Sequence, residues 1–329
     1  MAIYGGNMYP FKLKPAVKSY LWGGNRLSSE FGIGTSETPI AEAWMLSCHP
    51  AGTSVILNGS LAGMLLSDVL PDNFEKILGV SSPADAGFPI LIKFIDANKD
   101  LSIQVHPGNE YHGVDSGESG KTEMWYILDA EEGAYIYYGF SKEVTKEEVL
   151  RHIEEKTITS ILNRVYVKKG DSFYIRSGTV HSMGPGVFVA EIQQSSDLTY
   201  RIYDYDRTDA AGKKRQLHID KALDVADRTF VPGPPVRPAA ISHKGYSISR
   251  LVSCEYFTVD FVEIKTSAEF ICGDESFESI LITAGSGRLQ FDNPAFPAMD
   301  VKKGDSILLP VGTGRYRIEG ACEALLTSK

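Results

Sequence analysis

A five-residue pattern occurs twice in this chain and links its two halves to one kind of local structure. Lys168-Lys169-Gly170-Asp171-Ser172 is followed by Gly178-Thr179, and Lys302-Lys303-Gly304-Asp305-Ser306 is followed by Gly312-Thr313 at the same spacing. The Gly-Asp pair suits a turn, and the residues after it suit a strand. Two related β units in one chain are therefore the simplest interpretation.

Short strands dominate the predicted structure, and two stretches depart from them. Strand-like runs bounded by Gly, Pro, Asn and Asp favour a barrel or a sandwich. Residues 60–78 have helical apolar spacing that Pro71 interrupts, and residues 141–165 open with the possible caps Ser141 and Thr145. We expect residues 141–165 to form a helical insert that lies across the mouth of the first barrel.

The Pro-rich segment 231–238 is the best candidate for a domain boundary. The chain has 329 residues, which is enough for two domains of ordinary size. We predict a first domain over residues 1–238, with the helical insert near 141–165, and a second domain over residues 239–329.

Composition and charge exclude several classes of function. The formal net charge is −9 and the longest basic run is Lys213-Lys214-Arg215, so we expect no nucleic-acid partner. No segment approaches the ~18 continuous apolar residues of a membrane span, and no signal peptide is evident, so we expect no membrane association. The four cysteines show no CxxC spacing, which is typical of a reduced, cytoplasmic protein.

The segment Leu101–Pro107 (LSIQVHP) carries a possible metal-binding pattern. In a strand, Ser102, Gln104 and His106 share one face and the aliphatic residues share the other. Neutral imidazole nitrogen and amide oxygen are both competent metal ligands. For this segment alone, a solvated strand face that happens to carry a histidine is an equally good interpretation.

Two further segments complete a ligand set. Glu123 shares a strand face with Lys121 in a β-branched and aromatic run, and His181 follows the Gly170-Asp171 turn, a strand and Gly178. Gln and His, then Glu, then a distant His after a G-D…G-x-x-H strand is the ligand order of the cupin barrel. We therefore predict a mainly β chain of two cupin (jelly-roll) barrels with a small helical insertion.

The second copy of the repeat lacks these ligands. Glu278 matches Glu123, but Arg315 stands at the position of His181, and no Gln-x-His precedes Glu278. We expect a metal-free second barrel and one metal ion per chain.

The combined segments resemble type I phosphomannose isomerase. The resemblance runs from Lys14 to about Arg207 and rests on LSIQVHP, Lys121-Thr122-Glu123, Gly178–His181 and Glu191–Arg201 (EIQQSSDLTYR). Tyr20–Gly24 (YLWGG) and Glu42–Trp44 (EAW) are further matching segments.

The resemblance implies a zinc-dependent enzyme that interconverts mannose 6-phosphate and fructose 6-phosphate. It places the zinc ligands at Gln104, His106, Glu123 and His181. Only 58 positions separate Glu123 from His181, whereas long family members carry a large helical domain there, so this chain resembles the short bacterial form. The missing insert leaves the sugar preference open.

Aldose–ketose isomerisation also needs a base, because a proton leaves the carbon beside the carbonyl. Glu191 lies opposite the apolar face of the predicted strand 187–193, ten residues after His181. A partly desolvated carboxylate with a raised pKa suits general acid–base catalysis. A solvent-facing glutamate is the ordinary alternative for Glu191, and Lys121 is the alternative base or proton shuttle.

The remaining candidates would bind a phosphorylated hexose. Arg201 is the first choice for the phosphate and the third expected catalytic residue, because a guanidinium matches phosphate oxygens in a fork. Lys93 lies in an apolar strand and needs an anionic partner, either the phosphate or a carboxylate such as Asp96. Three further side chains are expected to orient Arg201 or a sugar hydroxyl, contact the phosphate and wall the pocket, respectively: Asp197, Ser102 and Trp22.

Other functions remain open on the sequence alone. A cupin oxygenase would hold iron with His and carboxylate ligands, but Gln104 as a ligand and the cations Lys93, Lys121 and Arg201 argue against it. A sugar-binding cupin without catalysis would not need both Glu191 and Lys121. Another phosphosugar isomerase of the cupin class also fits. We expect a monomer or a homodimer.

Overall fold

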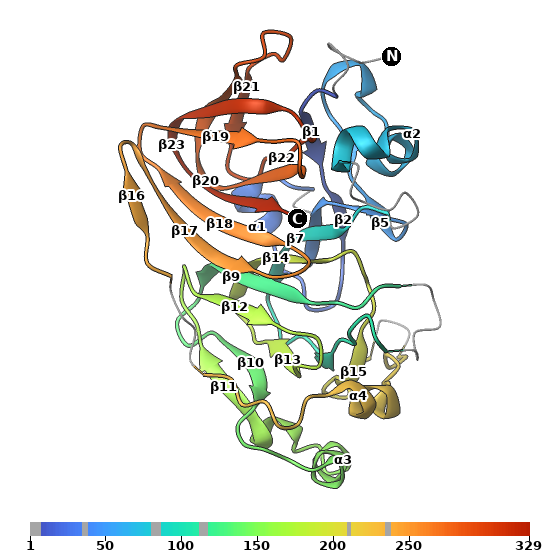
Figure 1. Cartoon of the computed structure of the whole chain (residues 1–329). Helices are drawn as coiled ribbons and strands as arrows, with labels where there is room; N and C mark the ends of the chain where they lie inside the picture. Colours follow the sequence, from blue (N-terminus) through green and yellow to red (C-terminus); the bar gives the residue numbers. More distant parts are fainter. Residues whose placement is uncertain (1–7, 35–38, 80–86, 112–117, 209–211, 234–237) are drawn as a thin grey trace.

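Strands are the main regular structure in the computed structural model, which describes residues 8–34, 39–79, 87–111, 118–208, 212–233 and 238–329 (Figure 1). The mainly β prediction is confirmed. The helices are α1 (Arg26–Phe31), α2 (Leu66–Leu78), α3 (Lys146–Glu154) and α4 (Ile219–Val225), with the 3-10 turns η1 (Gly59–Leu61) and η2 (Ile158–Ile161). Among the described residues, no helix is long and apolar enough to cross a membrane.

Two sheets face each other in the first unit. The five-stranded sheet has the order β11-β10-β13-β8-β15. Its strands are β8 (Ile103–Val105), β10 (Tyr135–Phe140), β11 (Leu162–Tyr166), β13 (His181–Met183) and β15 (Tyr200–Tyr203). The six-stranded sheet has the order β12-β9-β14-β7-β3-β2. Its strands are β2 (Ala16–Lys18), β3 (Glu42–Leu46), β7 (Ile90–Ala97), β9 (Glu123–Ala130), β12 (Ser172–Ile175) and β14 (Val187–Gln194), and a hairpin of β4 (Cys48–His49) and β5 (Gly52–Thr53) lies beside it.

Period-2 alternation along these strands separates polar groups from the outer cores. On β14, Phe188, Ala190 and Ile192 enter the cluster toward the second unit, while Val189 enters the cluster between the two sheets. Glu191 therefore points between the sheets, as the strand pattern predicted. The same alternation directs Ile103 and Val105 of β8 to an outer cluster and leaves Gln104 on the inner face.

The second unit is one ten-stranded sheet that curls around its own apolar core (Figure 1). Its strands are β16 (Ile241–His243), β17 (Tyr246–Ser253), β18 (Thr258–Ile264), β19 (Ser267–Cys272), β20 (Glu278–Phe291), β21 (Met299–Lys302), β22 (Ser306–Leu309) and β23 (Gly314–Ser328), together with the early strands β1 (Phe11–Lys14) and β6 (Val55–Ile56). The N-terminal segment thus connects the two units, because its strand β1 pairs with β22 of the second unit. Residues 234–237 of the Pro-rich segment lie outside the described residues, and the domain boundary stays a prediction.

The sequence repeat corresponds to one turn that is built twice. The Asp171 carboxylate accepts the backbone N–H of Lys168 at 2.9 Å, and Asp305 accepts that of Lys302 at 2.9 Å. Gly170 and Gly304 between them have φ of 88° and 91°, a region in which glycine has no steric cost. The Lys-Lys-Gly-Asp pattern therefore reports local backbone chemistry that both units share.

The helical insert lies elsewhere than predicted. Thr145 caps α3, since its hydroxyl accepts the backbone N–H of Glu148 at 3.1 Å. Val149 and Ile153 of that helix pack with Ile103 and Val105 on the outer side of the five-stranded sheet. The helix is therefore not placed across the barrel mouth as expected, because its apolar face packs in the cluster on the outer side of β8.

Both helical stretches are also shorter than predicted. Residues Leu162–Tyr166 form β11, which pairs with β10, so sheet pairing overrides the helical spacing at the end of that insert. The other helix begins only at Leu66, and Pro71 lies inside it, with Asn73 at non-helical angles two residues later.

A partly buried acid in the second unit, Glu278, predicts a pH-dependent stability. Burial raises the pKa of Glu278 to about 7, although the Tyr316 hydroxyl donates a hydrogen bond to it. Ionising Glu278 in the folded state therefore costs free energy that the unfolded chain does not pay. The contribution of Glu278 to the free energy of unfolding is fully present below the pKa that this carboxyl has in the unfolded chain. It is lost as the pH rises through about 7, the pKa in the folded protein.

We expect Glu278→Gln to gain stability relative to the parent protein by about 1–3 kcal/mol between about pH 4.5 and about pH 8. Urea unfolding at several pH values measures this difference. A constant difference across that range would contradict the assignment.

Candidate active site and metal centre

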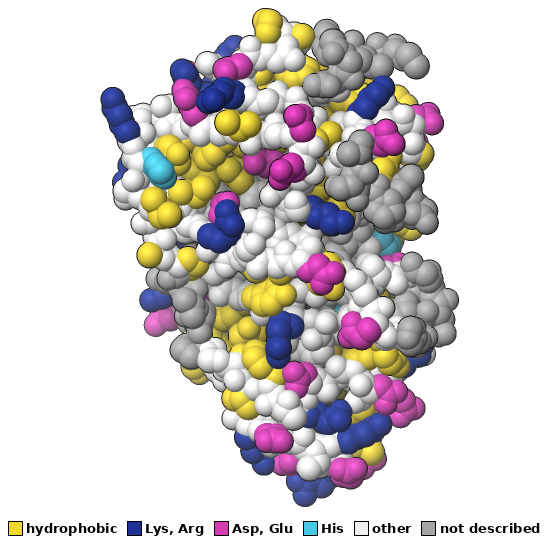
Figure 2. All heavy atoms as spheres, in the orientation of Figure 1, with side chains coloured by type: hydrophobic (Ala, Val, Ile, Leu, Met, Phe, Trp, Pro, Cys, Tyr) yellow, Lys and Arg dark blue, Asp and Glu magenta, His cyan; other side chains and the backbone are white. Residues whose placement is uncertain are grey.

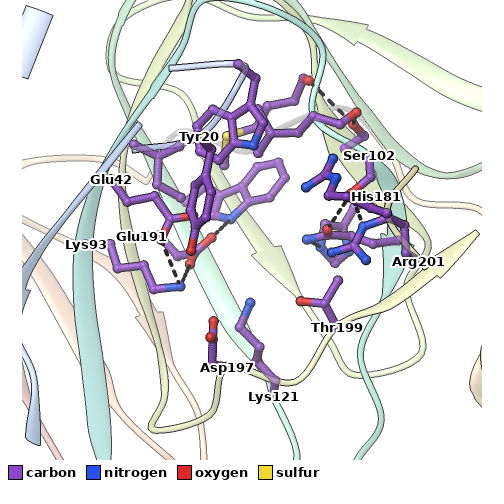
Figure 3. Close-up of a pocket in the computed structure, with 18 of the residues that line it drawn as sticks. Tyr20, Glu42, Lys93, Ser102, Lys121, His181, Glu191, Asp197, Thr199 and Arg201 are labelled. Atoms are coloured by element: carbon purple, nitrogen blue, oxygen red, sulfur yellow. Dashed lines mark hydrogen bonds and ion pairs between the residues drawn. The ribbon is translucent and has the colours of Figure 1, made fainter. Parts of the chain in front are cut away.

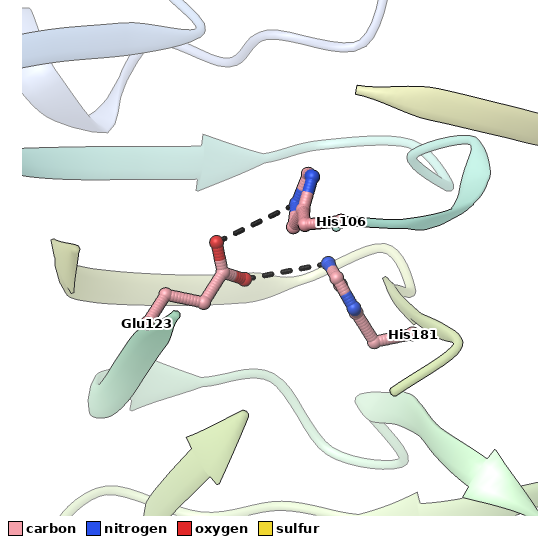
Figure 4. A group of neighbouring side chains, drawn as sticks. All are labelled: His106, Glu123 and His181. Atoms are coloured by element: carbon pink, nitrogen blue, oxygen red, sulfur yellow. Dashed lines mark ion pairs between the residues drawn. The ribbon is translucent and has the colours of Figure 1, made fainter. Parts of the chain in front are cut away.

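Three buried side chains from separate strands converge between the sheets of the first unit (Figure 4). His106 follows β8, Glu123 begins β9 and His181 begins β13. The Glu123 carboxylate lies 3.5 Å from Nε2 of His106 and 3.3 Å from Nε2 of His181, and one ligand atom from each residue lies within 4.8 Å of the others. This spacing suits a single divalent ion bound by all three.

The two imidazoles are prepared to act as ligands. Burial lowers the pKa of His106 well below its usual value, and nearby Lys121 lowers it further. Burial also lowers the pKa of His181. The Nδ1 of His181 lies 2.8 Å from the carbonyl of Thr179, which fixes the proton on Nδ1 and leaves the Nε2 lone pair toward Glu123. Neutral, oriented imidazoles are the form that binds metals.

The buried side chains of this group are suited to bind a divalent ion. Both carboxylate oxygens of Glu123 are fully buried, and although the Lys121 ammonium lies 2.9 Å from Oε2, neither oxygen accepts a hydrogen bond of good geometry among the described residues. Such oxygens are costly unless a cation satisfies them. The amide of Gln104 lies 3.5 Å from Nε2 of both histidines, and amide oxygen and nitrogen are interchangeable by rotation. Two imidazoles, a carboxylate and an amide oxygen would therefore hold the ion.

A cavity of about 310 Å³ opens beside this cluster (Figure 3). It contains nine of the predicted site residues, which come from both sheets and from the loops at their ends. They are Trp22, Lys93, Ser102, Gln104, Lys121, His181, Glu191, Asp197 and Arg201. His106 and Glu123 belong to the three-residue group with His181 and are not among the residues that line the cavity.

Glu191 is buried in a network of cations and indoles. Its Oε2 accepts the Trp125 indole N–H at 2.9 Å, and its Oε1 lies 3.3 Å from the Lys93 ammonium. Burial alone would raise the pKa of the Glu191 carboxyl, but Lys121 and Lys93 hold it below its usual value. The expected raised pKa is therefore wrong, because the two lysines outweigh desolvation.

Lys93 is paired with carboxylates. Its ammonium lies between Glu191 and Glu42, which is 3.8 Å away and also accepts the Trp44 indole N–H at 2.7 Å. Asp96 is not the partner, since it accepts the backbone N–H of Arg26. The carboxylate alternative for Lys93 is thus the one that the structure favours, and phosphate contact by Lys93 stays a prediction.

Lys121 lies against His106 and Glu123, and Arg201 lies beside Ser102 and His181, across the cavity from Lys93 (Figure 3). The Lys121 ammonium is 2.9 Å from Glu123 and 3.0 Å from Nε2 of His106. Arg201 donates from Nε to the Ser102 hydroxyl at 3.2 Å and from Nη1 to the Gln216 carbonyl at 3.0 Å. The Ser102 hydroxyl lies 3.2 Å from the Gln104 amide oxygen, so one hydroxyl joins Arg201 to the predicted metal ligand.

Several cavity residues were not among the predicted site residues: Tyr20, Glu42, Thr199, Arg215 and His218. Tyr20 and Glu42 stand in the YLWGG and EAW segments, so the resemblance held a signal for them. Arg215 is the last residue of the basic run Lys213-Lys214-Arg215, which on the sequence bears only on nucleic-acid binding.

Comparisons with known proteins agree with this geometry. A family model for the catalytic domain of type I phosphomannose isomerase matches residues 10–135, and a mannose-6-phosphate isomerase cupin-domain model matches residues 247–328. The chain is 39% identical to mannose-6-phosphate isomerase ManA of Bacillus subtilis over 97% of its own length and 98% of that protein. The chain belongs to the type I phosphomannose isomerase family.

Other members of the family agree in length and in fold. A mannose-6-phosphate isomerase of Streptococcus mutans is 38% identical over 96% of this chain and 97% of that one. The crystal structure of the Bacillus subtilis mannose 6-phosphate isomerase superposes with a TM-score of 0.89, at 37% identity, over 97% of this chain and 99% of that one. The Escherichia coli enzyme matches over only 38% of this chain and 32% of its own length. The recognised family and the expectation of an isomerase are therefore confirmed.

The His106–Glu123–His181 group predicts a specific loss of bound metal on mutation. We expect Glu123→Gln to reduce bound metal from about one ion per chain to nearly none, since it removes the anionic ligand. Metal analysis after equilibration with zinc and dialysis measures this.

The matched control is Glu278→Gln in the second unit, which changes the equivalent glutamate of the repeat and should leave the metal content unchanged. Equal metal loss in both variants, or in neither, would contradict the assignment of the ligands.

Proposed function

We propose that this chain is a zinc-dependent isomerase that interconverts mannose 6-phosphate and fructose 6-phosphate through an enediol intermediate. The observation that carries the proposal is the His106–Glu123–His181 cluster beside a cavity that is also lined by a guanidinium, that of Arg201. The names of the relatives that match nearly the full chain support the same reaction. A cytoplasmic location and a monomer or homodimer stay predictions.

The metal end of the cavity would bind the sugar oxygens. A bound divalent ion supplies positive charge that stabilises the negative charge developing on oxygen in the enediol. The ligands would be His106, Glu123, His181 and Gln104, all of which lie in or beside the cavity. The Thr179 carbonyl and the Ser102 hydroxyl hold two of these ligands in orientation.

Glu191 is the proposed base. Its pKa lies below the usual range, so the carboxylate is ionised at neutral pH, but it is a weaker base than a carboxylate with a raised pKa. The Trp125 indole and Lys93 fix its two oxygens in place. Lys121, at the metal end, is positioned to stabilise charge or to return a proton to the neighbouring carbon.

Arg201 would anchor the phosphate. Its guanidinium faces the cavity with neutral partners on Nε and Nη1, which leaves its positive charge available to an anion. Asp197 and Trp22 line the same cavity and are proposed to contact sugar hydroxyls and the sugar face.

Turnover and metal dependence are tested together. Purified protein should convert mannose 6-phosphate to fructose 6-phosphate, lose activity when zinc is chelated, and regain it when zinc is added. Zinc-loaded protein without turnover of this substrate would contradict the proposal, and turnover of a different hexose phosphate would identify another isomerase of the same class.

The base assignment has its own test. Glu191→Gln should lower kcat about 10²–10⁴-fold and abolish exchange of the substrate C2 hydrogen with solvent, since no carboxylate would remain to accept it. Binding of inorganic phosphate should be unchanged.

Lys121→Met is the comparison variant, and it should slow turnover while retaining some exchange at C2. Exchange that survives in Glu191→Gln and disappears in Lys121→Met would assign the base to Lys121 instead.

A further inference from the structure

A buried aspartate outside the cavity holds two arginines. Asp204, directly after β15, is 5% exposed. Arg215 donates to it twice, from Nε to Oδ2 at 2.8 Å and from Nη2 to Oδ1 at 2.5 Å. Arg207 donates to Asp204 Oδ1 and to the carbonyl of Asp100. Two parallel hydrogen bonds from one guanidinium fix both its position and its plane, so Arg215 is held rigidly.

The turn that directly follows Asp204 has a strained backbone. Tyr205 and Asp206 are consecutive non-glycine residues with φ of 55° and 54°. Each such residue carries a steric cost in the left-handed region. The turn is closed by the Arg207 backbone N–H, which donates to the Asp204 carbonyl at 3.1 Å. Strain of this kind persists where surrounding contacts require a fixed geometry.

Arg215 brings a second guanidinium to the cavity that Arg201 lines. The segment after Arg215 runs beside β15, since the Gln216 carbonyl accepts from Arg201 and the His218 backbone N–H donates to the Arg201 carbonyl at 2.8 Å. Burial, and then the neighbouring charge of Arg215, lower the pKa of Arg201. Two neighbouring cations raise each other's free energy unless an anion lies between them.

The cations that line the cavity differ in whether a carboxylate is their partner. Lys93 is paired with Glu42 and Glu191, and Lys121 is paired with Glu123. The hydrogen-bond partners that the structure gives the Arg201 side chain are the Ser102 hydroxyl and a backbone carbonyl, both neutral. Among the described residues, Arg201 is therefore hydrogen-bonded in the cavity to neutral groups alone, whereas Arg215 is paired with Asp204.

We propose that Arg215 is a second guanidinium for the substrate phosphate, and that Asp204 is a positioning residue that acts through Arg215. This inference rests on the proposed function and adds residues to its phosphate site. Because Arg215 donates from Nε and Nη2 to Asp204, and Arg201 from Nε and Nη1 to Ser102 and Gln216, the phosphate would meet the outer edge of each guanidinium, so that one tetrahedral dianion is contacted from two sides.

The test measures binding of inorganic phosphate to the metal-loaded protein by calorimetry, alongside KM and kcat for mannose 6-phosphate. Arg215→Met should weaken phosphate binding and raise KM about 10–100-fold, the loss expected for charge-assisted hydrogen bonds, while kcat changes by less than about threefold. Asp204→Asn should weaken phosphate binding about tenfold, although Asp204 does not line the cavity.

Two further variants separate positioning from general damage to the fold. Arg207→Met removes the other arginine that Asp204 holds, and Arg207 does not line the cavity, so phosphate binding should stay within about threefold of the parent. In the Arg215→Met background, Asp204→Asn should cause no further loss, because it acts through the absent guanidinium.

Unchanged phosphate binding in Arg215→Met would overturn the proposal. So would a full additional loss from Asp204→Asn in that background, or a loss in Arg207→Met equal to that in Asp204→Asn. Parent protein that binds phosphate as described but does not turn over the sugar phosphate would contradict the proposed function and leave this inference standing.

Discussion

The buried Glu123 carboxylate, faced by two neutral imidazoles, is the interaction on which the rest of the site depends. A carboxylate that is 0% exposed is strongly unfavourable unless cations compensate it. The structure supplies Lys121 beside it and a ligand geometry that would accept a divalent ion. Strands β8, β9 and β13 must keep their register to hold this arrangement, and the pairing of His181 with Gln104 across β13 and β8 fixes two of the ligands directly.

The layered fold allows such a polar site to exist inside a stable protein. Each site strand carries polar residues on the inner face and apolar residues on the outer face, which pack against either the helices or the second unit. The second unit thus covers the six-stranded sheet, and the early strands β1 and β6 belong to the ten-stranded sheet of the second unit. On the face shown in Figure 2, basic and acidic side chains are interspersed. Four cations line the cavity, namely Lys93, Lys121, Arg201 and Arg215.

Local periodicity was enough to predict much of this site from the sequence. Alternation placed Gln104 and His106 on one face and turned Glu191 away from the apolar face of its strand, as the structure shows. Patterns that depend on distant partners were harder to interpret. The helical insert packs on the outer face of β8, and two lysines reverse the expected shift in the pKa of Glu191. Arg215 had no local signal, because only folding brings Asp204 to it.

Anomalous diffraction from a crystal of the zinc-loaded protein, measured on both sides of the zinc absorption edge, tests the central claim most directly. The account predicts one strong zinc peak per chain, within about 2.0–2.3 Å of His106, Glu123 and His181, with the Gln104 amide completing the set. A zinc peak at Glu278 in the second unit, or none at the three-residue cluster, would contradict it.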